Sequence, residues 1–591
     1  MHSFSARKPH NTTVHVQNNS TRTHTMAGAH HKLRELSHHV RRTAAALDKA
    51  MSRLCSLCKS YAHHHVTERA ARWRHALRCG AGQVWPSRLG SLLVHAAYLL
   101  AVSWLGYLLL DELKFRAPPA GHGGGRGRPR GIDLFFTAVS AVTVSSMSAV
   151  EMEVFSYGQL FVLTVLMFAG GEVFVSLVGL ASKWYKLRKQ GIGISQRVES
   201  HDDGGVELET TPQVANAADI ESWTRNSDET SKSPIDAKRL RREAVRSLSL
   251  VVLAILVVAH VLGAAAIAAY VYTSPGARRT LRSKALSVWT FAVFTTVSTF
   301  SSCGFMPNNE NMAAFRRDTG LQLLLMPLAL AGNTLFPTLL AVCVRAAAAA
   351  TRRPELVEMT ARNGRELTGY YHHLLPARRC AMLAATVAGL VAVQVCMVCG
   401  MEWGGALRGM GPWEKVSNAV FVAVNSRHTG ESTLDLSTLA PAILVLLVLM
   451  MYLPPYTTWF PFEESSGVKD HPTEETPGVR LLKSTALSQL SYLAIFIIAI
   501  CVTERENLEE DPLNFSLLSI VVEVVSAYGN VGFSMGYSCS RQISPDALCT
   551  DRWTGFVGRW SDSGKLILIL VMLFGRLKKF SIKGGKAWKL G

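Results

Sequence analysis

The segment FFTAVSAVTVSSMSAVEM, residues 135 to 152, decides the fold because a segment of the same kind occurs four times in the chain. Each of the four is moderately apolar, is too short to span a membrane, and ends in a turn rich in Ser, Thr and Gly. The other three are FAVFTTVSTFSSCGFMPN (291 to 308), AVFVAVNSRHTGESTLD (419 to 435) and VVEVVSAYGNVGFSMGY (521 to 537). Such self-similarity indicates internal repeats, so one architecture contains all four segments.

Each segment lies between two longer apolar stretches. About 20 residues, rising ~1.5 Å each, are enough for a helix to cross ~30 Å of hydrocarbon. We therefore predict eight membrane helices, at 91–110, 159–182, 247–272, 320–350, 380–402, 436–460, 484–503 and 564–584.

Non-helical backbone at membrane depth is tolerated only where it is buried in protein or lines water. Four units of helix, re-entrant pore loop and helix therefore predict an all-α membrane protein whose repeats surround one central pore with pseudo-fourfold symmetry. An interfacial helix or a plain loop is the alternative for any one segment considered alone.

The composition fits this interpretation. The chain has 591 residues, of which 48% are hydrophobic and 18% charged, which is too apolar for an ordinary cytosolic enzyme of this size. The net charge of +19 is concentrated at one end, because residues 1–88 hold 15 Lys and Arg against 3 Asp and Glu. We expect this basic arm to be poorly ordered and cytosolic, and we expect no nucleic acid partner.

The charges of the loops suggest the topology. Basic loops such as KWYKLRKQ and KRLRR favour the cytosolic side, which places both termini in the cytosol. We expect the plasma membrane as the location. The predicted organisation is a basic N-terminal arm at 1–88, four repeats A to D at 89–184, 246–351, 378–461 and 482–591, and cytosolic linkers at 185–245, 352–377 and 462–481.

The arrangement and the turn sequences resemble the plant high-affinity potassium transporter (HKT) family of the Trk/Ktr/HKT superfamily. The matching motifs are TVSSMS, NSRHTGES, SAYGNVGFSMGY and GKLILILVMLFGRLKKF, and the resemblance covers roughly residues 89 to 590. It implies one selectivity-filter residue per loop, usually Gly, at Ser146, Gly304, Gly430 and Gly532.

In this family, Ser at the first filter position marks the mainly Na⁺-selective members, and Gly marks members that also carry K⁺. The resemblance therefore implies Na⁺ uniport down the electrochemical gradient, in a channel-like manner. A K⁺ or Na⁺/K⁺ co-transporting member is the alternative. The only metal that we expect is the transported Na⁺ at the filter, and we expect no cofactor.

A filter replaces the water shell of an ion with carbonyl oxygens, and turning several of these toward one axis needs backbone angles that only Gly adopts freely. We expect the Cβ of Ser146 to narrow one quarter of the ring and to keep this backbone away from positive φ. That change should disfavour K⁺ more than the smaller Na⁺. The alternative is that Ser146 only caps the preceding helix.

The last helix carries positive charge at membrane depth. Arg576 lies 11 residues after Lys565, about 16 Å further along a helix. Facing the pore, Arg576 and Lys579 would repel cations and favour inward rectification. The alternative is that Arg576, Lys578 and Lys579 mark the cytosolic end of the helix and extend to the membrane surface.

Two further patterns concern gating and the outer surface. Pro454 and Pro455 must break the sixth helix, which predicts a gate below the filter, although a kink without function is the alternative. Cys539 and Cys549 lie on the outer side in this topology, where a disulfide between them is an open alternative.

A multispan membrane enzyme is the rival class of protein. It would need paired carboxylates or a nucleophile with its base at one membrane face, and the sequence offers neither such a constellation nor an ATP-binding P-loop. Four repeats in one chain complete one pore, so a homodimer would be an assembly option and not a requirement.

Overall fold

A computed structural model describes residues 87–116, 128–199, 234–360, 367–368, 371–458, 489–543 and 549–581. All regular secondary structure within these ranges is helical, which confirms the predicted all-α class. The chain forms two units, Met1–Ser87 and Arg88–Gly591, and only the second is described below. The predicted arm at 1–88, apart from its last two residues, and the linker at 462–481 lie outside the described residues.

Four short, largely buried helices begin just before the four repeated segments and end within them. They are the pore helices α3 (Gly131–Thr143), α9 (Val288–Phe300), α15 (Pro412–Asn425) and α20 (Leu517–Gly529). Each one ends a few residues before the predicted filter position of its repeat, so the repeated segments fold as a short helix followed by a turn.

A longer helix precedes each pore helix, and we call these four the outer helices. They are α2 (Ser87–Glu112), α7 (Pro234–Thr273), α14 (Ala377–Glu402) and α18 (Gln489–Thr503). The inner helices follow the pore helices. They are α4 (Tyr157–Gly170) with α5 (Glu172–Glu199), α10 (Thr319–Gly332) with α11 (Phe336–Thr351), α16 (Pro441–Tyr452) and α21 (Asp562–Ser581).

Three of these helices are long and apolar enough to cross a membrane within the described residues, and the number is five when each bent pair counts as one span. The bent pairs are α4 with α5 and α10 with α11, which correspond to two of the predicted continuous spans. The inner helix of repeat C, α16, is shorter than predicted, because it ends at Tyr452, before the two prolines.

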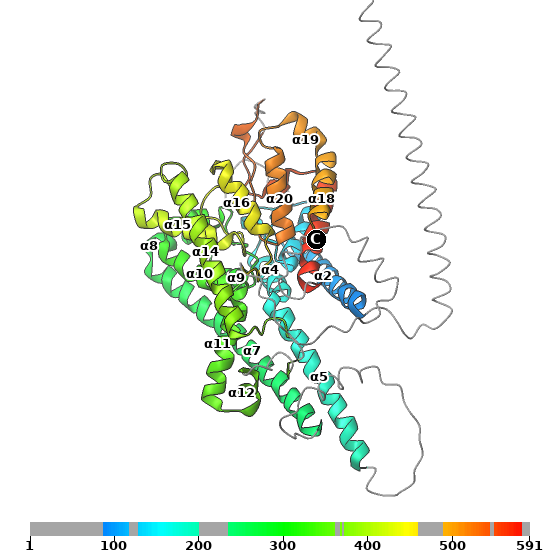
Figure 1. The fold of residues 1–591 in the computed structure, drawn as a ribbon. Helices are drawn as coiled ribbons and strands as arrows, with labels where there is room; N and C mark the ends of the chain where they lie inside the picture. Colours follow the sequence, from blue (N-terminus) through cyan, green and yellow to red (C-terminus); the bar gives the residue numbers. More distant parts are fainter. Residues whose placement is uncertain are drawn as a thin grey trace, which may run out of the picture. The chain divides into compact units, whose positions relative to one another are not determined.

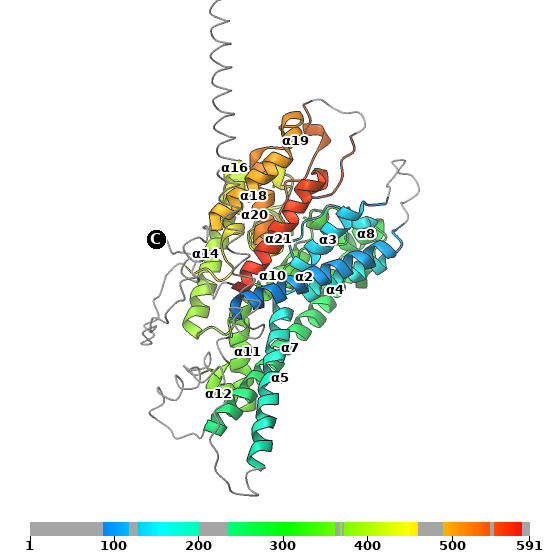
Figure 2. The same ribbon diagram turned by 90° about the vertical axis from the view of Figure 1, so that its right-hand side faces the viewer.

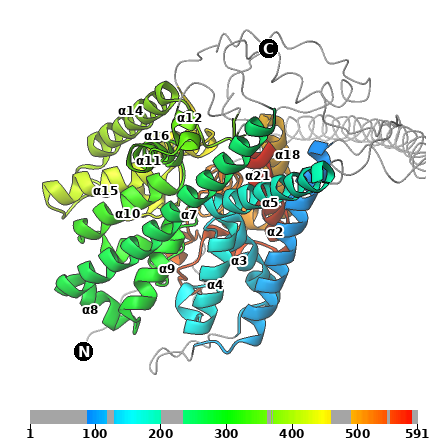
Figure 3. The same cartoon turned by 90° about the horizontal axis from the view of Figure 1, so that it is seen from below.

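The repeats close into a circle. Each pore helix packs against the inner helix of the repeat before it, in the pairs α4 with α9, α10 with α15, α16 with α20, and α21 with α3. The last pair joins the end of the chain to its beginning. Seen from below, the helices run in chain order from α2 through α4, α7 and α10 to α15 and α14, and α18 and α21 return beside α2 (Figure 3).

Three further α-helices within the described residues are short, namely α8 (Pro275–Ser283), α12 (Pro354–Thr360) and α19 (Arg505–Glu510). The far half of α5 is peripheral. Figures 1 and 2 both place α19 at one end of this unit and α12 with the end of α5 at the opposite end. A separate apolar cluster packs α5, α7, α11 and α12 together at that second end.

Candidate functional site

The four turns that follow the pore helices each have a positive φ at the predicted filter residue. The predicted filter residues Ser146, Gly304, Gly430 and Gly532 have φ values of 54°, 83°, 66° and 109°. Only glycine enters this left-handed region without steric cost. The expectation that the Cβ of Ser146 would keep its backbone away from positive φ is therefore wrong, and Ser146 retains a strain on the order of 1–2 kcal/mol.

Hydrogen bonds from the end of α3 explain why Ser146 holds this conformation. Ser145 N donates to Ser140 O at 2.9 Å, and Met147 N donates to Ser140 Oγ at 2.8 Å. The residues on both sides of Ser146 are thus fixed, and Ser146 must adopt the angles that connect them. The C-cap of α3 is Val144. The alternative that Ser146 caps this helix is therefore wrong.

The prediction missed the serines that hold these turns. In repeat D, Gly532 N donates to Ser526 Oγ at 3.0 Å, as Met147 N does to Ser140 Oγ in repeat A. Both serines lie six residues before the filter position. Repeat B has Ser298 at this spacing and repeat C has Val424, so a recurrent Ser at this offset was the available signal.

The filter turns contact one another in series, from repeat B through C and D to A, and we call Ser146, Gly304, Gly430 and Gly532 the ring. A Cβ built on Gly304 would clash with the carbonyl of Thr429 in repeat C, and one built on Gly430 would lie 2.8 Å from Gly532 Cα in repeat D. A Cβ built on Gly532 would lie 2.9 Å from Ser146 Oγ in repeat A. Each glycine is therefore in van der Waals contact with the next repeat and leaves no room for a side chain.

Two side-chain hydrogen bonds connect neighbouring repeats behind this ring. Asn530 Nδ2, in repeat D, donates to Ser145 Oγ, in repeat A, at 2.8 Å. Thr299 Oγ1, in repeat B, donates to Glu431 Oε1, in repeat C, at 2.6 Å. All four side chains are buried. These residues were not predicted, and no local pattern in the sequence distinguishes them from ordinary pore-helix and turn residues.

Three of the four inner helices break where they pass the end of a pore helix. The axis bends by 57° between α4 and α5 and by 82° between α10 and α11, and α16 stops at Tyr452. The crowding is severe at this level, because a Cβ on Gly170, Gly332 or Gly575 would clash with the carbonyl oxygen of a pore-helix residue. The helix α21, which contains Gly575, is the one that continues unbroken.

Arg576 follows Gly575 in this continuous helix. Its side chain is only 1% exposed, and it donates a hydrogen bond from Nη2 to the carbonyl oxygen of Gly170, at the break between α4 and α5. Glu172, just beyond that break, attracts it electrostatically. The guanidinium of Arg576 is therefore held inside the helix bundle. The helix α21 includes Lys579, but the side chain of Lys579 lies outside the described residues.

The prolines of repeat C lie directly after the end of α16. Their carbonyl oxygens both accept from Arg427 Nη2, at 2.8 Å for Pro454 and 3.4 Å for Pro455. Arg427 is 7% exposed and lies at the end of the pore helix of the same repeat, three residues before Gly430. A buried guanidinium therefore holds the segment that was predicted as a gate.

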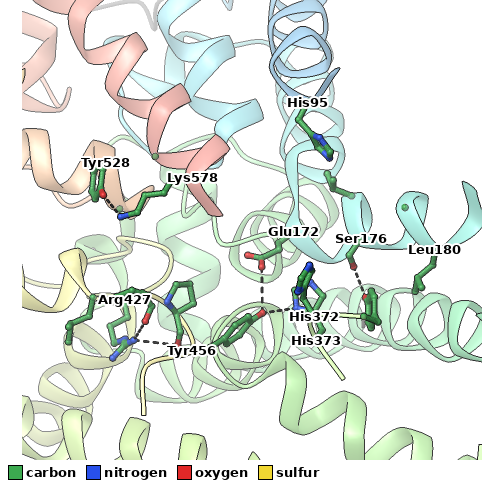
Figure 4. A pocket seen from close by; sticks show the side chains of 18 of the residues that line it. His95, Glu172, Ser176, Leu180, His372, His373, Arg427, Tyr456, Tyr528 and Lys578 are labelled. Atoms are coloured by element: carbon green, nitrogen blue, oxygen red, sulfur yellow. Dashed lines mark hydrogen bonds between the residues drawn. The ribbon is translucent and has the colours of Figure 1, made fainter. Parts of the chain in front are cut away.

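A cavity of about 380 Å³ lies beside these breaks (Figure 4). Gly575, Tyr528, Pro454 and Pro455 line it, together with the first turns of α5. Its charged lining residues are Glu172, Lys183, Arg427 and Lys578. Positive charge therefore exceeds negative charge on its wall, which is unfavourable for a free cation.

One network crosses the cavity. Tyr456 OH donates to Glu172 Oε1 at 3.5 Å and lies 2.8 Å from His373 Nδ1 (Figure 4). Tyr456 follows the two prolines, Glu172 begins the second half of the inner helix of repeat A, and His373 belongs to the connection between repeats B and C. Hydrogen bonds therefore join the segment after α16 to α5 and to the connection between repeats B and C.

Ion pairs join repeats at the other end of the pore helices. Lys565 Nζ, in α21, lies 2.7 Å from Asp133 Oδ1, in α3. Lys284, between α8 and α9, lies 2.9 Å from Glu153 Oε1 and also pairs with Glu310. Burial alone would lower the pKa of Lys284, but its bonds to the two carboxylates raise that pKa above its ordinary value.

A disulfide joins Cys539 to Cys549, with 5.9 Å between the Cα atoms. The disulfide that the sequence left open is therefore present. No group of three or more His, Cys, Asp or Glu side chains is placed to hold a resident metal ion in the part of the chain that the structure describes.

The matching family model and the similar proteins of known sequence are all described as cation or sodium transporters. The model of the TrkH family, described as "Cation transport protein", matches residues 214–583. The "Probable cation transporter HKT1;4" of Oryza sativa subsp. japonica is 70% identical over 503 residues, which cover 85% of this chain and 98% of that protein. The "Sodium transporter HKT1" of Arabidopsis thaliana is 44% identical over 468 residues, covering 78% and 89%.

Among solved structures, the potassium transporter TrkH from Vibrio parahaemolyticus aligns with a TM-score of 0.43 and 13% identity, over 85% of each chain.

Proposed function

The chain belongs to the HKT family of membrane cation transporters, and from that premise we propose that it is a Na⁺-selective uniporter, not a K⁺ or Na⁺/K⁺ co-transporting member. It is a transporter and not an enzyme. The observation that carries the proposal is the ring of Ser146, Gly304, Gly430 and Gly532, in which one residue of four has a side chain.

The physical argument for Na⁺ starts from the geometry of that ring. A Cβ built on Gly532 would meet the side chain of Ser146, so Ser146 occupies space next to the filter backbone that a fourth glycine would leave free. The ring is therefore less symmetric and less able to widen in this quarter. A larger dehydrated ion needs the wider ring, so K⁺ loses more binding free energy than Na⁺.

We propose that Arg576 is an electrostatic barrier below the filter. It is the single arginine of the one unbroken inner helix, and its charge lies next to the cavity that we assign to the cytosolic half of the pathway. A fixed positive charge there opposes cations that approach from the cytosol more than it opposes cations driven inward by a negative membrane potential. The result is inward rectification, to which Lys579 would add from the last turn of the helix.

We propose that the segment containing Pro454 and Pro455 is the gate. It follows the end of α16 and borders the cavity, and the side chains of Arg427 and Glu172, from other segments, bond to it. Such a segment can move without unfolding a helix.

The proposed setting is the plasma membrane, with both termini in the cytosol. The basic segments that border α5 and α7 support this orientation, because cytosolic loops carry the excess of Lys and Arg. The partners are Na⁺ and the lipid bilayer. A homodimer would place two complete pores side by side, since the four repeats of one chain form a closed circle.

The test is the reversal potential of currents through this chain in voltage-clamped oocytes, with external Na⁺ and K⁺ exchanged at constant ionic strength. We expect the reversal potential to follow external Na⁺ and to ignore K⁺. A reversal potential that follows K⁺ equally would keep the family and disprove the selectivity. No current from a protein that reaches the surface would disprove the uniport.

A further inference from the structure

The residue after each filter position is buried behind the ring, and one of these four residues differs in kind. Met147, Phe305 and Phe533 are apolar and 1–3% exposed. Their counterpart in repeat C is Glu431, which is 0% exposed. Three repeats thus fill this position with an apolar side chain, and the fourth buries a carboxyl group there.

One oxygen of this carboxyl has a partner. Glu431 Oε1 accepts from Thr299 Oγ1 at 2.6 Å, across the boundary between repeats C and B. The backbones also meet at this boundary, because a Cβ on Gly304 would lie 2.7 Å from the carbonyl carbon of Thr429. The carboxyl therefore lies where two quarters of the ring are in direct contact.

The other oxygen, Glu431 Oε2, is buried and has no hydrogen-bond partner among the residues that the structure describes. No basic side chain in those ranges forms an ion pair with Glu431 either. A buried carboxylate without a counter-charge is strongly unfavourable. A cation at Gly430, the adjacent residue, would supply the positive charge that this group lacks.

We propose that Glu431 is a positioning residue of the transporter, which supplies negative charge from behind the filter to a cation held in the ring. This inference rests on the proposed function in one respect, namely that a monovalent cation occupies the ring. The charge acts through the filter backbone and not by direct contact, since the side chain is fully buried. It raises the affinity for the cation and leaves the choice between Na⁺ and K⁺ to the ring itself.

The experiment compares Glu431→Gln with Thr299→Val in voltage-clamped oocytes. Glutamine keeps the shape and still accepts from Thr299, so Glu431→Gln removes only the charge, whereas Thr299→Val removes the hydrogen bond and keeps the charge. We expect Glu431→Gln to raise the half-saturating cation concentration about tenfold at an unchanged maximal current. We expect Thr299→Val to stay within about twofold of the wild type. An unchanged half-saturation in Glu431→Gln, or equal shifts in both variants, would overturn the proposal.

The exchange variant Thr299→Glu/Glu431→Thr provides a second test if Glu431→Gln does not reach the surface. It keeps one carboxyl and one hydroxyl at the same boundary. Wild-type half-saturation in this variant supports the charge role, and loss of affinity at normal surface expression contradicts it.

Binding can be measured without current. Cations that bind only the folded protein raise its Tm, so the Na⁺ concentration at half-maximal stabilisation should rise in purified Glu431→Gln. Titration with K⁺ separates the two proposals. Equal responses of the wild type to both ions would contradict Na⁺ selectivity, whereas the difference between wild type and Glu431→Gln alone decides the role of Glu431.

Discussion

Lys565 and Asp133 form an ion pair, 2.7 Å from Nζ to Oδ1, that joins the last inner helix to the first pore helix. The residues are 432 positions apart in the sequence. Lys565 is 0% exposed and Asp133 is 9% exposed, so the pair is shielded from water. The helices α21 and α3 make the contact between repeat D and repeat A. This ion pair therefore stabilises the boundary at which the circle of repeats closes.

Replacing Lys565 with Met should therefore destabilise the protein. The change leaves the carboxylate of Asp133 without its buried partner, and breaking such a pair costs about 3–5 kcal/mol. The measurement is the Tm of the purified protein in detergent. Arg130→Gln is the control, because Arg130 also bonds Asp133 but its side chain is 57% exposed, and we expect a loss of about 1 kcal/mol or less. Equal losses in both variants would show that burial does not set the strength of this pair.

Replacing Ser146 with Gly should admit K⁺. The side chain that adjoins Gly532 disappears, the strain at positive φ is relieved, and the fourth quarter of the ring resembles the other three. We expect the permeability ratio of K⁺ to Na⁺ to rise about tenfold, which corresponds to about 1.4 kcal/mol. Bi-ionic reversal potentials measure this ratio. Ser148→Ala, outside the ring, is the control, and the same ratio in Ser146→Gly as in this control would refute our account of Ser146.

Replacing Gly532 with Ala should abolish transport. The new Cβ would collide with Ser146, so the turn of repeat D could not remain where it is. Gly536 offers a matched control, because it too has a positive φ, of 62°, but nothing lies within 4 Å of the site of its Cβ. We expect Gly536→Ala to lose only about 1 kcal/mol of stability and to keep its current. Currents and surface expression of both variants decide the matter, and a functional Gly532→Ala protein would argue against the close contact in the ring.

Replacing Arg576 with Gln should enlarge the outward current. The fixed charge of the guanidinium at the carbonyl of Gly170 disappears, since Gln is neutral. The ratio of outward to inward conductance at equal driving force measures the effect, and we expect an increase of about two- to tenfold. Arg408→Gln is the control because that side chain is exposed. Rectification that matches the control would remove Arg576 from the barrier.

Replacing Arg427 with Gln should ease opening of the segment at Pro454 and Pro455. Two carbonyl oxygens lose the guanidinium that holds them, which should shift a closed-to-open equilibrium by about 0.5–2 kcal/mol. Larger macroscopic conductance at unchanged selectivity is the expected result. Arg427→Lys keeps the charge, and its conductance should lie between those of Arg427→Gln and the wild type. Smaller currents in Arg427→Gln than in the wild type would instead show that Arg427 supports the open state.

Local pattern determined much of this protein. The four repeated segments and the apolar stretches around them are readable from one sequence, because each depends on residues close together in the chain. The filter positions at 146, 304, 430 and 532 came from the resemblance of the turn sequences to the HKT family. The end of α16 before Pro454 follows in the same way from the missing amide hydrogen of proline.

Only the tertiary structure decided which groups meet. Arg576 binds the carbonyl of Gly170 across 406 positions of sequence, and Glu431 meets Thr299 across a boundary between repeats. The left-handed backbone of Ser146 likewise depends on how its turn is anchored to α3. Closing four repeats into a ring sets these contacts, because the ring fixes distances between residues that no local periodicity relates.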